Sequence, residues 1–387
     1  MTRQPLTVAV VGATGLVGRT MVQVLLERQF PIAGLRLMAS GRSAGRSTTV
    51  DRVAYPVIEA QPAAFEGVDI ALFSAGASVS LELAPAAVAR GVTVIDNSNA
   101  WRMDPNVPLI VSQVNPADAA GHAGLIANPN CSTMQLAPVL MAVRDSVGID
   151  RVVVDTYQSV SGTGADAQAE LEAQVAAHVA GEPLTASVYP HPIAFNALPE
   201  IDTFLDNGYT REEWKVVTES RKILHLPDLR ISCTAARVPV FVSHSEAVHV
   251  QTTRPITPAR ARKLFAAVPG VVVQDDPSHH VYPLATVAAG RDEIFVGRIR
   301  QDASVSGDRG LAFWVVSDNL RKGAATNAVE IAELLVEHDW VKPAAERAKV
   351  EARVEANGEA KLEARPAPAK VKPAKVEAGQ VESGRPA

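Results

Sequence analysis

Short apolar runs of strand length alternate with stretches of helical spacing over the first part of the chain. The apolar runs are residues 6–11 (LTVAVV), 35–39, 68–74 and 92–96. Helices are expected among them, at residues 16–28 and 81–90. Strands that are apolar on both faces and separated by helices are typical of a parallel sheet covered on both sides. The pattern predicts an α/β fold in which residues 1–130 form a Rossmann-like, doubly wound parallel sheet.

The pattern changes near residue 150, where the apolar runs become longer and the connections less regular. The longer runs are RVVVDTYQSV, ISCTAARVPVFV and AVHVQTT, followed by ATVAAG and EIFVGRIR. We interpret all five as strands, and they predict a second, α+β catalytic and dimerisation domain with a mixed or antiparallel sheet over residues 131–318. Residues 319–340 have apolar side chains at helical spacing, and we expect a closing helix that completes the first domain.

After Trp340 the composition shifts to Ala, Glu, Lys, Arg, Val and Pro. Residues 343–387 contain no Phe, Trp, Tyr, Ile or Met. A segment without large apolar side chains cannot build a core. We therefore expect a disordered, Ala/Lys/Glu/Pro-rich tail.

Composition and charge limit the kind of protein this is. The chain has 387 residues, 47% of them hydrophobic and 20% charged, which is enough for two buried cores. No segment approaches the roughly 20 apolar residues that cross a bilayer, and the N-terminus lacks the pattern of a signal peptide. We therefore expect a cytoplasmic protein with no membrane partner. The formal net charge of −5 gives no reason to expect nucleic acid as a partner.

Three glycines stand where the first strand turns into the first helix, in the run Gly12-Ala-Thr-Gly15-Leu-Val-Gly18. Glycine permits a tight turn, and the free N–H groups of the helix N-terminus can receive a pyrophosphate. The same turn also occurs without a ligand, but its place after an N-terminal strand favours a dinucleotide site. The residues expected to contact the cofactor here are Gly12, Thr14, Gly15, Leu16 and Val17.

The end of the second strand bears on the choice between NAD and NADP. Sites that prefer NAD usually have an acidic residue there, which binds the ribose hydroxyls. Here the strand runs into Leu-Met-Ala-Ser40-Gly-Arg42-Ser43, which has none. Ser40, Arg42 and Ser43 would suit a 2′-phosphate, although Arg42 could also be a solvated loop side chain. The sequence therefore favours NADP.

The two cysteines, Cys131 and Cys233, lie far apart, which argues against a disulfide framework and a Cys-rich metal site. Cys131 stands in Asn128-Pro-Asn130-Cys-Ser-Thr, after an apolar strand and before a helical run, and Asn130 can cap that helix. A helix N-terminus stabilises a thiolate, so Cys131 is a candidate nucleophile, the alternative being a packed thiol. Cys233 lies in a strand-like run and is interpreted as a small buried side chain.

Seven motifs make the chain similar to aspartate-semialdehyde dehydrogenases over residues 6–340: GATGLVG, ASGRSAG, NPNCST, QSVSGTG, ESRKIL, RVPVFVSHSE and SDNLRKGAA, in this order. The resemblance implies NADPH-dependent reductive dephosphorylation of L-4-aspartyl phosphate to L-aspartate 4-semialdehyde through a thioester on Cys131. That reaction lies on the route to lysine, threonine, methionine and diaminopimelate. The resemblance also implies a homodimer formed through the sheet of the second domain.

The resemblance assigns roles to individual residues. It implies that His244 is the general base, that Gln158 orients the acyl group and that Arg237 clamps the substrate α-carboxylate. The remaining implied roles are the substrate ammonium for Glu219, the phosphate for Arg102, Lys222 and Asn99, and the nicotinamide half of the cofactor for Ser161, Gly162 and Asn319. No metal is expected, because the adjacent His279 and His280 have no cysteine or carboxylate at ligand spacing. The chain departs from the family at Val242 and Ser243, where threonine and glycine are expected.

Two alternatives stay open. An N-acetyl-glutamyl-phosphate reductase would use the same chemistry on an acylated substrate, which needs no carboxylate for its nitrogen; Glu219 is therefore the discriminating residue. A non-catalytic paralogue would keep the fold and the cofactor, but the joint presence of Cys131, Gln158, Arg237 and His244 opposes it.

Overall fold

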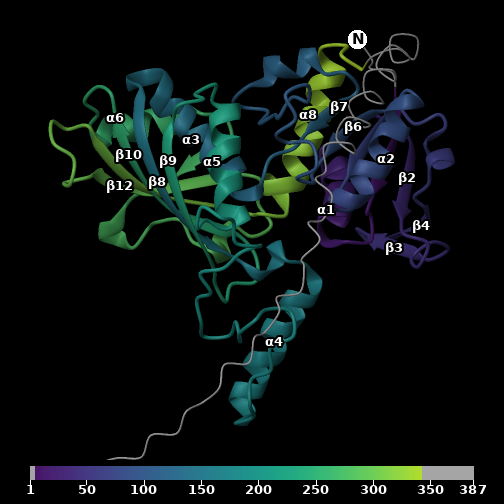
Figure 1. The fold of residues 1–387 in the computed structure, drawn as a ribbon, viewed down its shortest axis with the longest axis horizontal. Coiled ribbons are helices and arrows are strands. Elements are labelled where there is room, and N and C mark those ends of the chain that lie inside the picture. The colour runs from purple at the N-terminus through teal and green to yellow at the C-terminus, as the bar shows by residue number, and fades with distance from the viewer. Residues whose placement is uncertain (1–4, 342–387) are drawn as a thin grey trace, which may run out of the picture.

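The computed structural model describes residues 5–341. Two sheets lie side by side, each with helices packed against it, and a long helix projects from the body (Figure 1). The predicted tail at residues 343–387 lies outside the described residues. Within residues 5–341, no helix is both long and apolar enough to cross a membrane.

The first sheet has seven strands in the order β3-β4-β2-β1-β5-β6-β7. Their bounds are β1 Leu6–Val11, β2 Ile32–Ala39, β3 Ser47–Val50, β4 Val53–Glu59, β5 Ile70–Phe73, β6 Thr93–Asp96 and β7 Leu125–Ala127. All neighbours are parallel except the hairpin pair β3 and β4. This confirms the predicted Rossmann-like parallel sheet.

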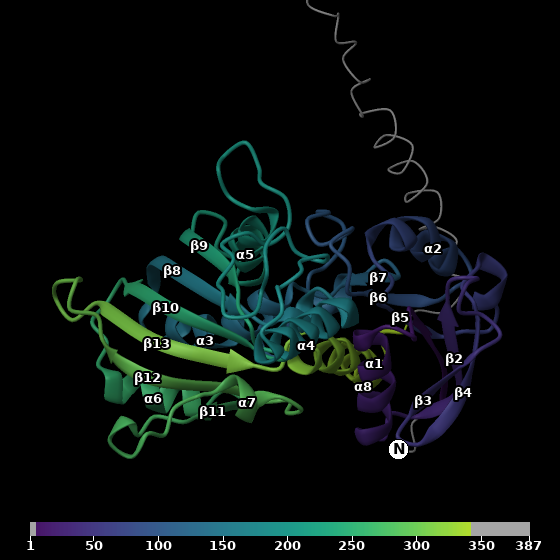
Figure 2. The same cartoon turned by 90° about the horizontal axis from the view of Figure 1, so that it is seen from below.

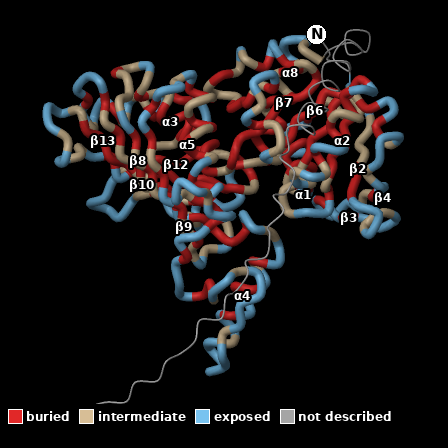
Figure 3. The backbone as a smooth tube through the Cα atoms, viewed as in Figure 1, coloured by how far each residue is buried: buried red, intermediate tan, exposed pale blue. Residues whose placement is uncertain are grey.

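Helices cover both faces of the first sheet because its strands are apolar on both sides. On β1, Val8 and Val10 belong to the core under α1 (Leu16–Glu27), whereas Ala9 and Val11 belong to the core under α2 (Ala77–Ala89). All four side chains are fully buried. Figure 3 shows this burial through the centre of both sheets.

The second sheet has six strands in the order β11-β12-β13-β10-β8-β9. Their bounds are β8 Ile149–Gln158, β9 Arg230–Arg237, β10 His244–Thr252, β11 Val271–Val273, β12 Ile294–Gln301 and β13 Gly310–Ser317. The pairs β8/β9 and β11/β12 are parallel and the others antiparallel, so the sheet is mixed. One core joins the sheet to the helices α3 Cys131–Val147, α5 Arg211–Ile223 and α6 Pro258–Ala266. The predicted α+β domain is thereby confirmed.

One strand prediction is wrong. Residues 285–290 (ATVAAG) were expected to form a strand, but the structure has the short helix α7 (Ala285–Ala288) there. A short run of small apolar residues has no periodicity that separates a strand from a helical turn. The chain packs this turn against β13, where Ala288 is buried beside Phe295 and Val316.

The remaining helices connect these layers. The projecting helix is α4 (Ala165–Ala180), and short 3-10 turns are η1 Pro62–Phe65, η2 Pro116–Gly121, η3 Val160–Gly162 and η4 Pro277–His279. After β13 the chain forms a π-helical turn, η5 (Arg321–Thr326), and then α8 (Asn327–Glu337). Figure 2 shows α8 beside α1, between the two sheets. The chain therefore returns to the first sheet after completing the second.

Candidate active site

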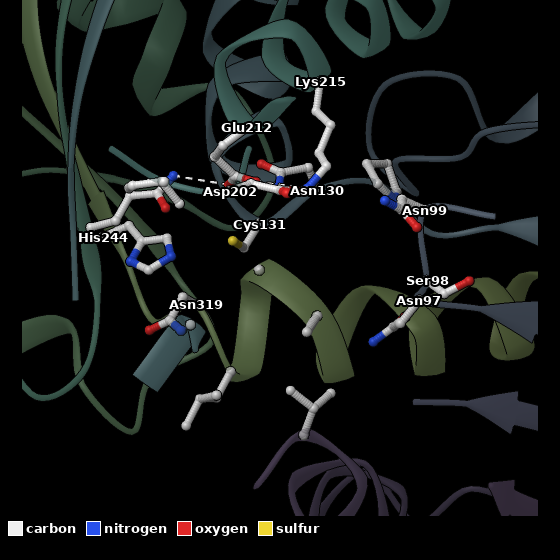
Figure 4. A pocket seen from close by; sticks show the side chains of 18 of the residues that line it. Asn97, Ser98, Asn99, Asn130, Cys131, Asp202, Glu212, Lys215, His244 and Asn319 are labelled. Carbon is white, nitrogen blue, oxygen red and sulfur yellow. Dashed lines mark hydrogen bonds and ion pairs between the residues drawn. The ribbon is translucent and has the colours of Figure 1, made fainter. Parts of the chain in front are cut away.

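A cavity of about 490 Å³ lies where the two sheets meet. Both halves of the chain line it, from the first turn of α1 to the π-helical turn η5. The predicted site residues that line it are Val17, Asn99, Arg102, Cys131, Gln158, Ser161, Gly162, Arg237, His244 and Asn319. In Figure 4, Cys131 lies at the centre, with His244 and Asn319 on one side and Asn99 on the other.

Cys131 is the first residue of α3, as the sequence predicts. The side-chain oxygen of Asn130 accepts hydrogen bonds from the backbone N–H groups of Ser132 and Thr133, at 3.0 and 3.5 Å. Asn128 ties the same loop to η5 by donating to the carbonyl of Ala324 at 3.1 Å. Asn128 and Asn130 thus hold the Cys131 thiol at the N-terminus of α3 and close to η5.

The electrostatics around the thiol differ from the sequence expectation of a stabilised thiolate. Desolvation raises the pKa of Cys131 to about 12, and the negative charge of Glu212 adds to the rise. Arg237, Arg102 and Lys215 act in the opposite direction. Burial therefore outweighs the nearby cations and the helix dipole, so a thiolate requires a change in the surrounding charge.

Three neighbouring strands end at the cavity and bring their polar residues together. Gln158 ends β8, Arg237 ends the paired strand β9 and His244 begins β10. Gln158 donates from Nε2 to Ser132 at 2.6 Å and to Glu212 at 3.1 Å. The Arg237 guanidinium donates to the carbonyl of Ser159 at 2.7 Å, and its Nε has no protein partner. The cavity wall therefore has a buried guanidinium with capacity for a ligand.

His244 is fully buried, and its Nε2 has no protein partner. Burial lowers the pKa of His244 to about 3, and the adjacent Arg237 adds to the effect. The ring is therefore neutral at physiological pH. Ser243, immediately before it, has φ of 80°, a backbone conformation that favours the glycine expected at this position.

The structure does not place Glu219 and Lys222 on the cavity wall, and this corrects the two expectations. The Glu219 carboxylate accepts from Arg102 at 3.0 Å and from the backbone N–H of Asn130 at 2.7 Å, and it is not among the residues that line the cavity. The Lys222 ammonium donates to the carbonyls of Arg102, Asp104 and Val107, each at 2.8 Å. An ammonium has three hydrogens, so none is left for a phosphate. Glu219 and Lys222 therefore bind neighbouring residues of the site and do not line the cavity themselves.

Glu212 and Lys215, seven residues earlier on α5, line the cavity instead. Glu212 accepts from the side chain of Asn130 at 2.8 Å and from Lys215 at 3.0 Å. Lys215 also donates to Asp202 at 2.9 Å, which leaves one ammonium hydrogen without a partner. The sequence contains Glu-x-x-Lys twice on this helix, and residues seven apart share a face. No local signal distinguishes the two copies.

The glycine turn fits a dinucleotide. Gly12 has φ of 85°, and a Cβ on it would lie 2.6 Å from the carbonyl oxygen of Ser74. Gly15 caps α1 with no side-chain hydrogen bond, so the first N–H groups of this helix are open to a pyrophosphate. Ser40, Arg42 and Ser43 follow β2 at the carboxyl edge of the sheet, and Arg42 is exposed. The turn is therefore suited to a bound nicotinamide cofactor.

Asn319 is oriented by its neighbours. Its Oδ1 accepts hydrogen bonds from Ser159 Oγ at 3.1 Å, Ser161 Oγ at 3.0 Å and the backbone N–H of Ser243 at 2.9 Å. Three donors on one oxygen fix the amide, so its NH₂ group is the part available to a ligand. Over residues 5–341, no group of three or more His, Cys, Asp or Glu side chains is arranged to hold a metal ion.

Comparison with known proteins agrees with this geometry. Residues 7–122 match the family described as "Semialdehyde dehydrogenase, NAD binding domain", and residues 140–322 match "Semialdehyde dehydrogenase, dimerisation domain". The chain is 52% identical to the aspartate-semialdehyde dehydrogenase of Aquifex aeolicus, over 86% of this chain and 99% of that protein. It is 49% identical to that of Bacillus subtilis, over 85% and 97% of the two chains.

Among solved structures, the chain resembles aspartate semialdehyde dehydrogenase II of Vibrio cholerae in complex with ASA. The TM-score is 0.83 and the identity 44%, over 86% of this chain and 99% of that one. With relatives of this similarity covering most of its length, the chain belongs to the aspartate-semialdehyde dehydrogenase family.

Proposed function

We propose that this chain catalyses the NADPH-dependent reductive dephosphorylation of L-4-aspartyl phosphate to L-aspartate 4-semialdehyde, through a thioester on Cys131. The reaction serves the synthesis of lysine, threonine, methionine and diaminopimelate. The observation that carries the proposal is the cavity itself. It places a thiol at a helix N-terminus among Arg237, Glu212 and Lys215, which match the three charged groups of the substrate.

Each substrate group has a partner of opposite charge. Arg237 has the planar guanidinium that suits an α-carboxylate. Glu212 takes the place that the sequence analysis gave to Glu219, as partner of the α-ammonium. Lys215 takes the place of Lys222 and binds the phosphate together with Arg102, whose guanidinium keeps unused N–H groups after its bonds to Asn97, Asn128 and Glu219.

Binding of the substrate also prepares the nucleophile. The charge of Glu212 raises the pKa of the Cys131 thiol. An α-ammonium beside Glu212 neutralises that charge, so the substrate itself favours the thiolate. Gln158, held by Ser132 and Glu212, keeps the acyl group beside the sulfur. A bound nicotinamide cofactor supplies the hydride that reduces the thioester.

The preference for NADP rests on the loop after β2. This loop has no acidic residue, and Arg42 is exposed and free to meet a 2′-phosphate. The cofactor would extend from the glycine turn to Ser161, Gly162 and Asn319, which line the cavity. The fixed Asn319 amide presents its NH₂ group to the carboxamide of the nicotinamide.

We also propose a homodimer that forms through the second sheet. The support is the face of this sheet that α3 does not cover. Tyr157 and Trp314 project from this face, opposite the side that carries α3, with ring centroids 5.4 Å apart. Tyr157 is 39% exposed, which is unusual for a large aromatic side chain on a central strand. Light scattering of the purified chain tests the assembly, and a monomer at micromolar concentration would contradict it.

The test of the function is phosphate-dependent reduction of NADP with L-aspartate 4-semialdehyde, run beside N-acetyl-glutamate semialdehyde. We expect turnover with the first substrate alone, and none after Cys131→Ala. Turnover with the acetylated substrate alone would make the chain an N-acetyl-glutamyl-phosphate reductase, which Glu212 in the cavity opposes. No turnover with either substrate, in folded protein that binds NADP, would support the non-catalytic paralogue.

A further inference from the structure

A carboxyl group that the proposed reaction does not use is buried in the second domain. Glu246 is the third residue of β10, and its side chain is fully buried. Within residues 5–341, neither of its carboxyl oxygens has a hydrogen-bond partner. A buried polar group without a partner costs free energy, so a position that keeps one is a candidate for a function.

Polar side chains face Glu246 from two neighbouring elements. Thr156 stands opposite it on β8, and directly opposed side chains of antiparallel strands have Cβ atoms about 4.5–5.5 Å apart. Gln135 on α3 is close enough to lower the pKa of the carboxyl, against the larger effect of burial. The Gln135 Oε1 accepts a hydrogen bond from Ser317 on β13 at 2.6 Å, whereas its Nε2 and the Thr156 hydroxyl have no full hydrogen bond to the described part of the chain. Glu246, Gln135, Thr156 and Ser317 thus form a buried polar layer.

This polar layer lies between the cavity and the apolar core. Three of its members each follow or precede a cavity residue on the same element: Gln135 with Cys131 on α3, Thr156 with Gln158 on β8, and Glu246 with His244 on β10. The spacing is one helical turn or two strand positions, so each pair shares a face of its element. One step further along the same faces are Val139, Val154 and Val248, which belong to the apolar core. The layer therefore lies where α3 packs against β8 and β10, directly beneath the reacting groups (Figure 2).

The surroundings of Glu246 favour its neutral form. A buried carboxylate without a cation is much less stable than the protonated acid. Among the described residues no charged group acts on this carboxyl, and burial raises its pKa well above the usual value. The groups that face it are Gln135 from α3, Thr156 from β8, Val315 and Ser317 from β13, the His244 ring on its own strand and the Cys233 thiol on β9.

We infer that Glu246 is a positioning residue: as a neutral carboxylic acid it complements the Gln135 amide and the Thr156 hydroxyl, and so fixes the spacing of α3, β8 and β10 beneath the cavity. A neutral acid has one O–H donor and an accepting C=O, which suits an amide on one side and a hydroxyl on the other. An apolar side chain of the same size would leave both groups without a complement, and α3 could shift along the sheet. The inference rests on the proposed function only for the reaction that this alignment serves.

An ionised Glu246 would act against the reaction. Its negative charge would lie beside Gln135, one helical turn below Cys131. The thiol already has its pKa raised by burial and by the charge of Glu212, and a second carboxylate would oppose the thiolate further. The neutral acid orders the polar layer without this cost.

The first test determines the charge of Glu246 in the full chain, without substrate. We expect the infrared spectrum of the wild-type chain at pH 7, minus that of Glu246→Gln, to contain the C=O stretch of a protonated carboxylic acid. The reason is that the substitution removes this carboxyl and leaves the shape of the side chain. Bands of an ionised carboxylate in the same difference spectrum would overturn the inference.

The second test compares Glu246→Gln with Glu246→Leu in the phosphate-dependent reduction of NADP with L-aspartate 4-semialdehyde. Glutamine keeps a neutral polar group of the same shape, so its kcat should stay close to wild type. Leucine disrupts the polar layer, and the resulting misalignment should lower kcat about 10- to 100-fold with little change in KM. Val248→Ala opens the apolar core two positions further along β10, so this control should lower the free energy of unfolding but keep kcat.

The outcomes separate positioning from stability. Equal kcat in the glutamine and leucine variants, or the same loss in Val248→Ala as in Glu246→Leu, would refute the positioning role. If Glu246→Leu does not fold, Thr156→Val takes its place, because it removes only the opposing hydroxyl and should lower kcat in the same way. If the wild-type chain had no activity, the proposed function would fail, while the infrared spectrum would still decide whether Glu246 is the neutral group that the inference requires.

Discussion

The two lysines of α5 allow a matched test of which one binds phosphate. Lys215→Met and Lys222→Met each replace an ammonium by an apolar side chain of similar length on the same helix. Lys215 Nζ lies on the cavity wall with one free hydrogen, whereas Lys222 Nζ is bound by three carbonyls. The first variant should therefore affect substrate binding and the second should affect stability.

The magnitudes follow from the bonds that are lost. A hydrogen bond from a charged group contributes about 1.5–3 kcal/mol, and 1.4 kcal/mol is tenfold in affinity, so Lys215→Met should raise the KM for phosphate about 10- to 100-fold. Its loss also leaves the Glu212 carboxylate without the cation that pairs with it, and this negative charge repels an anion. Lys222→Met removes the hydrogen bonds that its ammonium donates to three carbonyls, which should lower the free energy of unfolding by about 1–3 kcal/mol.

The assay is initial-rate reduction of NADP at varied phosphate, together with urea unfolding of each variant. Lys215→Arg serves as the control that keeps the charge, and its KM should lie closer to wild type. The reasoning is refuted if Lys222→Met raises the KM for phosphate as much as Lys215→Met and leaves the unfolding free energy unchanged.

Three further predictions follow from single residues. Ser243→Gly should increase the free energy of unfolding by about 1 kcal/mol in urea titrations, without loss of turnover. The reason is that Ser243 has φ of 80° and that its buried hydroxyl has no hydrogen-bond partner. A destabilised variant would contradict this. Burial raises the pKa of Glu246 well above its usual value of 4.5, so the folded state keeps a proton that the unfolded chain releases near that usual value. Wild-type stability should therefore fall as pH rises from the unfolded pKa towards the folded one, and the stability gained by Glu246→Gln should be larger at pH 8 than at pH 5; a gain independent of pH would show that Glu246 is ionised in the folded state. Arg42→Ala should lower kcat/KM for NADP about tenfold and leave that for NAD unchanged, since the proposed partner of this exposed guanidinium is the 2′-phosphate, which NAD lacks. Equal losses with both cofactors would show that Arg42 does not distinguish NADP from NAD.

The sequence by itself determined the architecture and the position of Cys131 at the start of a helix. Both depend on information that is local in the chain: the period of the apolar residues, three glycines after a strand, and an Asn-Cys pair at a helix start. The resemblance to the family also predicted Gln158, Arg237 and His244 as site residues, and all three line the cavity. A short run such as residues 285–290 lacks that information, and there the prediction was wrong.

Only the tertiary structure decided which Glu-x-x-Lys of α5 lines the cavity. A shift of seven residues keeps the helix face but moves a side chain about 10 Å along the axis. Whether that position reaches the cavity or the loop of residues 102–107 depends on how α5 packs against its neighbours. The hydrogen bond from the Ser159 N–H group to His244 Nδ1 likewise joins residues 85 positions apart in the chain. Both features depend on contacts between segments far apart in the sequence, and local sequence patterns do not predict such contacts.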